Sequence, residues 1–188
     1  MHSRTIVEPG SPREGGRRAA RALPFSAVAT DPSADLAITD LSGYEATLDV
    51  RLVMFNQLSV VIDPYTHQSG WILPTAARIF NHYQEADVRC AFLVAADAEG
   101  ATSYLGPYAE DHLVLLDPER KLIESLGLEY LPALVHLRQD ASLAGAAEGW
   151  QPADWLEVLD GVEETMAWRS KPQLPAKGDP APFAGTPA

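Results

Sequence analysis

Cysteine is almost absent from this chain of 188 residues, since Cys90 is the only one. A single cysteine excludes an intrachain disulfide and any metal site built from several cysteines. It is typical of proteins from a reducing compartment, so we expect a cytoplasmic protein. Cys90 stands in the apolar run RCAFLV. There cysteine behaves as a small hydrophobe, and burial raises its pKa and lowers its reactivity.

Long apolar runs and a basic charge balance are also missing. No apolar run approaches the roughly 20 residues that a membrane-spanning helix needs, and no apolar stretch follows the N-terminal arginines as in a signal peptide. The formal net charge of -12 repels phosphate backbones, so we expect no nucleic-acid partner. His82, His112 and His136 do not have the spacing of metal ligands, and we expect neither a metal nor another cofactor.

Two terminal segments differ in composition from the rest of the chain. Residues 1–33 are rich in Gly, Pro, Ser and Arg, and such a segment buries too little apolar surface to become ordered alone. Residues 171–188, KPQLPAKGDPAPFAGTPA, are rich in proline and are expected to form an extended, mobile tail. We therefore predict a flexible basic arm, one domain at residues 34–170, and a proline-rich tail.

Strand and helix signals alternate within this domain. Apolar or alternating runs predict strands at 47–55 (TLDVRLVMF), 58–62, 89–97, 112–116, 131–137 and 141–150. Helical spacing predicts helices at 70–83 with a kink at Pro74, at 117–127 with Asp117 as cap, and from Pro152 onward. The alternation predicts an α/β fold with a central mixed sheet flanked by helices.

Three features lie in a familiar order. An apolar strand leads into Tyr65-Thr66-His67-Gln68-Ser69, Pro74 follows five residues after Ser69, and Leu131-Pro132-Ala133 precedes a strand and the terminal helix. This order resembles the thioredoxin-like superfamily. The extra strand and helix between Cys90 and Pro132 are similar to its thiol-disulfide reductase and peroxiredoxin-like branch. The resemblance implies a thioredoxin-like fold over about residues 45–168, with Pro132 as the family's cis-proline facing the site.

The resemblance also shows which groups are replaced. Thr66-His67-Gln68-Ser69 stands where the family has Cys-x-x-Cys, and Val60 and Ile62 stand where family members often have a buried acid and an aromatic. Disulfide exchange needs a thiolate, and a hydroxyl has far too high a pKa to replace it. We therefore expect that the chain is not a dithiol oxidoreductase.

Several interpretations of single residues remain open. Thr66 either caps an inert helix or belongs to a docking surface. His67 is expected to be an exposed polar residue, and a triad of Asp63, His67 and Ser69 is rejected because local spacing does not define one. The tryptophans are expected to be core residues or interface anchors: Trp71, Trp150, Trp155 and Trp168.

We predict a redox-inactive protein that binds another protein, as an accessory subunit or assembly factor of a larger enzyme. The expected binding surface consists of Tyr65, Thr66, His67, Gln68, Ser69, Trp71, Leu131, Pro132 and Ala133. The backbone beside Pro132 could bind an extended peptide by strand addition. The alternative is an enzyme of the glutathione-transferase or peroxiredoxin-derived type, in which Ser69 or Thr66 orients a small thiol.

Overall fold

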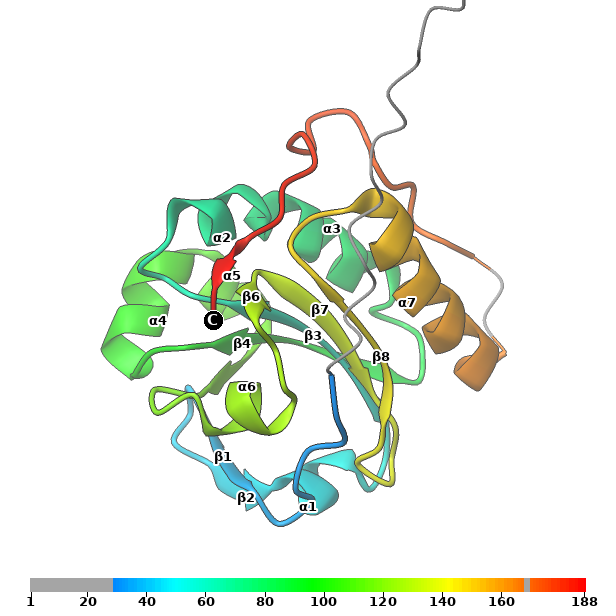
Figure 1. Ribbon diagram of the computed structural model, residues 1–188. Helices are drawn as coiled ribbons and strands as arrows, with labels where there is room; N and C mark the ends of the chain where they lie inside the picture. The colour runs from blue at the N-terminus through cyan, green and yellow to red at the C-terminus, as the bar shows by residue number, and fades with distance from the viewer. Residues whose placement is uncertain (1–28, 168–169) are drawn as a thin grey trace, which may run out of the picture.

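The computed structural model describes residues 29–167 and 170–188 (Figure 1). Most of the expected basic arm, residues 1–28, and Trp168 lie outside the described residues. In the described part, a mixed sheet lies between two layers of helices. This arrangement confirms the predicted α/β fold class.

The central sheet has seven strands in the order β2-β1-β5-β4-β3-β7-β8. Strands β3, β4 and β5 are parallel, whereas the outer neighbours pair antiparallel. The strands are β1 (Ala37–Asp40), β2 (Glu45–Thr47), β3 (Asn56–Ile62), β4 (Val88–Val94), β5 (Leu113–Leu116), β7 (Ala133–Leu137) and β8 (Leu143–Glu148). A separate small pair joins β6 (Tyr130–Leu131) to β9 (Thr186–Pro187).

Strand β3 is buried along its whole length, including its polar residues Asn56, Gln57 and Ser59. Burial of its run at 58–62 agrees with the prediction of a buried strand there. Because successive side chains point to opposite faces, Val60 and Val61 enter two different hydrophobic clusters. The first cluster also takes side chains from the layer of α3 and α7, and the second takes them from α1 and α6. The helices are α1 (Leu48–Leu52), α2 (His67–Trp71), α3 (Leu73–His82), α4 (Ala98–Leu105), α5 (Tyr108–Asp111), α6 (Lys121–Ser125) and α7 (Pro152–Met166).

The helix predicted at 70–83 is two helices rather than one kinked helix. They meet at Ile72, and Pro74 lies in the first turn of α3, where its missing N–H removes no helical hydrogen bond. Helix α6 is shorter than predicted, because Arg120 before it has the left-handed value φ 57°. The Asp117 carboxylate still accepts hydrogen bonds from the amides of Leu122 and Ile123, both at 2.9 Å.

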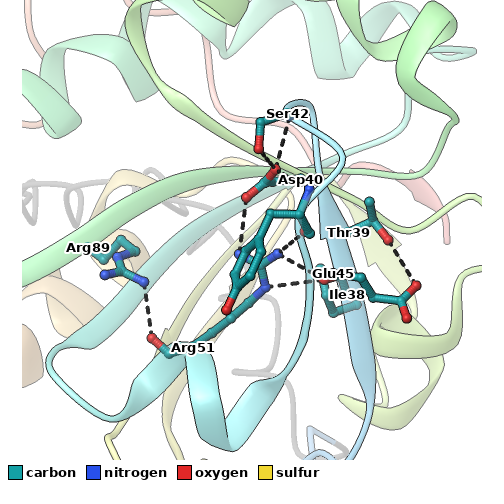
Figure 2. Close-up of polar contacts among 8 residues, drawn as sticks. Ile38, Thr39, Asp40, Ser42, Glu45, Arg51 and Arg89 are labelled. Atoms are coloured by element: carbon teal, nitrogen blue, oxygen red, sulfur yellow. Dashed lines mark hydrogen bonds and ion pairs between the residues drawn. The ribbon is translucent and has the colours of Figure 1, made fainter.

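The strand predicted at 47–55 is wrong after Thr47, because residues 48–52 form α1 and residues 53–55 belong to no strand. The cause is tertiary: Arg51 is buried, and its guanidinium donates hydrogen bonds to the carbonyls of Ile38 at 2.9 Å and Tyr44 at 2.7 Å. Figure 2 shows this guanidinium beneath the β1–β2 hairpin, with Arg89 bonded to the Arg51 carbonyl at 3.1 Å. A helical turn places the Arg51 side chain there while Leu48 and Leu52 enter the core.

Residues 171–188, called here the C-terminal tail and expected to be extended and mobile, make specific contacts with the domain. Leu174 is buried in the first hydrophobic cluster, and Asp179 forms an ion pair with Arg78 of α3 at 2.8 Å. In Figure 1 the tail, coloured orange to red, passes from α7 over α3 and ends beside β6. Proline keeps it extended, but specific side chains attach it to the domain.

Candidate functional site

Asp63 organises the loop between β3 and α2. Its carboxylate accepts a hydrogen bond from the Tyr65 amide at 2.8 Å, and its carbonyl accepts one from the Thr66 amide at 3.2 Å. These contacts form the compact turn that an aspartate commonly makes with its own following backbone. Helix α2 then begins at His67, directly after Thr66.

The hydroxyls of Thr66 and Ser69, called here the hydroxyl pair, face one another at the start of α2. Their oxygens are 3.0 Å apart, and the Thr66 hydroxyl is also 3.1 Å from the Asp63 carbonyl. Ser69 is fully buried and accepts a hydrogen bond from the Asp63 amide at 3.0 Å. The Thr66 side chain therefore binds Ser69 and Asp63, and it makes no capping hydrogen bond to α2.

The hydroxyl pair contains no sulfur and therefore cannot form a thiolate. Val60 and Ile62, the positions at which the resemblance placed an acid and an aromatic, are both fully buried aliphatic side chains. The contacts of Thr66 and Ser69 are internal hydrogen bonds of the loop. In chemical terms the arrangement supports the loop, and it offers no nucleophile for disulfide exchange.

The sequence analysis missed the main partner of Asp63. Arg120 donates a hydrogen bond from Nη2 to the Asp63 carboxylate at 2.7 Å, and the Asp63 side chain is 6% exposed. The nearby Tyr104 hydroxyl lies 3.4 Å from the Thr66 carbonyl. Burial, and then the charge of Asp63, raise the pKa of Tyr104 to about 12. The left-handed Arg120 aims its side chain back at the loop, and no local sequence pattern signals that contact.

Nine residues were predicted to form one binding surface, and the structure divides them into three groups. Tyr65 and Trp71 are 79% and 53% exposed, and His67 is also exposed. Thr66 and Gln68 are half-buried. The fully or largely covered members are Ser69, Leu131, Pro132 and Ala133.

The segment Leu131-Pro132-Ala133 lies beside the end of β3. Its Leu131–Pro132 peptide bond is cis, and Ala133 pairs with Val61 two residues before Asp63. This backbone is not open, because Leu131 pairs antiparallel with Thr186 of β9. Phe183 of the same tail lies against Trp71, with ring centroids 5.6 Å apart in an edge-to-face arrangement. The C-terminal tail thus covers part of the predicted binding surface.

Cys90 and His136, which both lie outside the loop, also have unusual surroundings. Burial raises the pKa of Cys90 to about 12, in the direction that its sequence context predicts. His136 on β7 is fully buried; burial and then the charge of Arg138 lower its pKa to about 4. Among residues 29–167 and 170–188, no three His, Cys, Asp or Glu side chains converge as metal ligands do.

None of the helices within residues 29–167 and 170–188 has the length and apolar character that spanning a bilayer requires.

Comparison with solved structures finds the same fold in thiol-disulfide oxidoreductases. A protein assigned as the thiol:disulfide interchange protein DsbE of Chlorobium tepidum aligns with a TM-score of 0.61 and 14% identity, over 73% of this chain and 97% of that one. The thioredoxin domain of a thiol-disulfide oxidoreductase from Bacteroides vulgatus aligns with a TM-score of 0.55 and 12% identity, over 77% and 99%.

A secreted disulfide oxidoreductase of Mycobacterium tuberculosis gives a TM-score of 0.51 and 16% identity, over 62% of this chain and 85% of that chain. The sequence itself matches no family model and no curated protein. The structural likeness defines a thioredoxin-like fold. Within that fold this chain has one cysteine, consistent with replacement of the dithiol by Thr66 and Ser69.

Proposed function

We propose that this chain is a redox-inactive thioredoxin-like protein of the cytoplasm that binds another protein, as an accessory subunit or assembly factor. One observation carries the proposal: an extended segment is already paired with the backbone at Tyr130–Leu131. That backbone lies on the segment next to the cis bond of Pro132. Strand addition is a common way for a sheet edge to bind a peptide, since main-chain hydrogen bonds supply affinity whatever the sequence.

Two exposed aromatic side chains lie at the ends of helix α2, Tyr65 shortly before it and Trp71 at its last residue, where it contacts Phe183 of the tail. Tyr65 and Trp71 are both more than half exposed, and tyrosine and tryptophan are enriched among the residues that dominate binding energy at protein interfaces. The hydroxyls of Thr66 and Ser69 in the neighbouring loop take part in internal hydrogen bonds. A protein-binding role would use the exposed side chains of Tyr65 and Trp71 without any rearrangement of these hydrogen bonds.

The alternative, an enzyme that orients a small thiol, has less support from these contacts. Ser69 is 0% exposed, and its oxygen already accepts a hydrogen bond from the Asp63 amide. The Thr66 hydroxyl has two acceptors within 3.1 Å, the oxygens of Asp63 and Ser69. A bound thiolate would have to displace these internal contacts, so we do not propose this function.

Affinity purification from the native cells, with mass spectrometry of what is retained, tests the proposal. We compare the wild type with Tyr65→Ala and with Tyr44→Ala, whose tyrosine is also more than half exposed but lies at the β1–β2 hairpin. We expect a stoichiometric partner that is lost in Tyr65→Ala and kept in Tyr44→Ala. A chain that purifies alone, or a partner retained equally by both variants, would contradict the proposal.

A second measurement tests redox inactivity. We expect the wild type to reduce insulin disulfides in the presence of dithiothreitol no faster than dithiothreitol alone, because disulfide exchange needs an accessible thiolate. A rate above this background that disappears in Cys90→Ala would overturn the assignment of an inactive site.

A further inference from the structure

The C-terminal tail is attached to the domain at successive points along its length. The Asp179 carboxylate accepts hydrogen bonds from the Thr75 hydroxyl at 2.7 Å and from both terminal nitrogens of Arg78. The indole of Trp150 then donates to the Pro180 carbonyl at 2.9 Å. These contacts with α3 and with Trp150, which lies between β8 and α7, direct the following residues toward β6.

The last residues of the tail make backbone contacts on two sides. Phe183 exchanges two hydrogen bonds with Trp150, at 2.8 and 3.0 Å. Further along, Thr186 pairs with Leu131 and Pro187 with Tyr130, and the Ala188 amide donates to the Glu129 carbonyl at 2.8 Å. The tail therefore lies as an added strand along the backbone of residues 129–131, called here the pairing edge.

Gly185 is required for this close approach. Its φ is +89°, and a Cβ placed there would lie 2.7 Å from the Leu131 carbonyl oxygen, which cannot move away without breaking the strand pair. The chain offers a control in Gly178, which has φ +101° and nothing within 4 Å of such a Cβ. Alanine is conformationally strained at both positions, but only at Gly185 does it also collide with the pairing edge.

The tail meets this edge with no charged side chain. Residues 181–188, APFAGTPA, have no ionisable side chain, although the chain as a whole has a net charge of -12. Recognition therefore depends on backbone hydrogen bonds, on the Phe183–Trp71 ring contact and on the close fit of Gly185. These are the features that a partner segment would have to reproduce.

We infer that residues 183–188 are an intramolecular ligand of the pairing edge, and that the edge binds an extended protein segment without charged side chains that has an aromatic residue two positions before a glycine. The inference rests on the proposed function and adds the chemistry of the partner and the control of access. A partner segment reaches Leu131 only when the tail has left it. A tether of this kind holds its ligand at an effective concentration on the order of a millimolar, so it competes with any segment in solution.

The test uses the full chain and a synthetic peptide, acetyl-APFAGTPA with a fluorophore, whose binding is followed by fluorescence anisotropy. We compare the wild type, Gly185→Ala and Gly178→Ala. Hydrogen exchange at the amides of Phe183 and Ala188 reports whether the tail is docked, because both amides are bonded to the domain. We expect fast exchange and about tenfold tighter peptide binding in Gly185→Ala, and wild-type behaviour in Gly178→Ala.

Three outcomes would overturn the inference. The first is an undocked tail in Gly185→Ala without any gain in peptide binding. The second is equal binding of a peptide in which alanine replaces the glycine. The third is that the amides of Phe183 and Ala188 stay protected from exchange both in Gly185→Ala and in the double variant Asp179→Ala/Gly185→Ala. The contacts of Asp179 and Gly185 would then not be what holds the tail.

Repeating the affinity purification with Gly185→Ala separates this inference from the proposed function. More partner from Gly185→Ala than from the wild type supports both. If the peptide binds as expected but no partner is recovered, the proposed function fails while the intramolecular contact stands. If a partner is recovered equally from both proteins, it binds without using the pairing edge, and the inference fails.

Discussion

The hydroxyl oxygens of Thr66 and Ser69 are 3.0 Å apart, on consecutive turns of backbone at the start of α2. The contact places the two side chains next to each other, at the positions where the resemblance puts the two cysteines. The loop therefore keeps these two groups adjacent while it contains only oxygen.

Replacing both residues with cysteine tests this geometry. We expect Thr66→Cys with Ser69→Cys to form an intrachain disulfide in air or in oxidised glutathione, because the two side chains are already in contact. Mass spectrometry of the folded protein should show the loss of two hydrogen atoms and one remaining thiol, Cys90. Either single variant serves as control and should keep both of its thiols. A double variant that retains three thiols under oxidising conditions would show that the loop is not preorganised.

The ion pair between Asp63 and Arg120 should stabilise the fold. Asp63→Asn keeps an oxygen for the Tyr65 amide but places an amide nitrogen against the guanidinium. We expect the free energy of unfolding to fall by about 1–2 kcal/mol, since Arg120 is partly exposed and the charge it loses is partly screened. Urea denaturation measures the change. The control is Lys121→Gln, which breaks the exposed pair with Glu119 and should change the stability by less than about 0.5 kcal/mol.

His136 should make the fold sensitive to acid. Burial and then the charge of Arg138 lower the pKa of His136 from its ordinary value of 6.5 to about 4, and neither ring nitrogen has a partner among the described residues. The unfolded chain thus binds the proton more tightly, so stability is lost as the pH falls below 6.5 and levels off below about 4. We expect a loss of about 2 kcal/mol between pH 7.5 and pH 5 from this residue.

Urea denaturation at several pH values measures that loss, and His136→Leu should remove it. An apolar replacement is expected to be tolerated at neutral pH, because the imidazole makes no hydrogen bond there. His112 also has a pKa lowered by burial, so the difference between wild type and variant isolates His136. An unchanged pH dependence in His136→Leu, matching that of the exposed-site control His67→Gln, would refute the assignment.

Cys90 should react slowly in the folded protein. Its pKa is raised from 9.0 to about 12 by burial, and only the thiolate is an effective nucleophile. At pH 8 we expect modification by 5,5′-dithiobis(2-nitrobenzoate) to be at least about 100-fold slower than in urea. Equal rates in the two conditions would mean that the thiol is accessible and ionised in the native state.

The elements that the sequence predicted well are those whose own residues decide their structure. β3 and β4 are rich in apolar residues, with valine in both, and both lie in the centre of the sheet. The terminal helix also follows its pattern, since Trp155, Leu159 and Val162 are all buried. The loop at Thr66, Pro74 and Pro132 follow one another along the chain as in the thioredoxin-like pattern, and this sequence order was enough to predict the fold.

The elements that were missed depend on contacts made at a distance. Residues 48–52 alternate like a strand, but burial of Arg51 against the carbonyls of Ile38 and Tyr44 favours a helical turn. The short strands β1 and β2 have few apolar residues and are stabilised by pairing with each other and with β5. Asp97 before α4 was a readable signal, since its side chain caps Gly100 at 2.9 Å.

The accessibility of the predicted binding surface could not be deduced from the sequence. The prediction of a mobile tail rested on composition alone, because proline and glycine favour an extended and irregular chain. Its attachment depends instead on single residues, such as Asp179 in its ion pair and Phe183 against Trp71. A composition averages over such residues, so it could not show that Leu131 is covered.

Gly149 and Gly185 cross with no side chain between them. A Cβ at Gly149 would lie 2.6 Å from the backbone of Ala184, and one at Gly185 would lie 3.3 Å from the Gly149 Cα. Neither residue can therefore change independently of the other segment. In related sequences, glycine at both positions should mark chains whose tail folds back in this way, and loss of either glycine should accompany a tail of different length or composition. Glycine at positions 149 and 185 would thus be a sequence signature of a pairing edge that is covered by the chain's own tail.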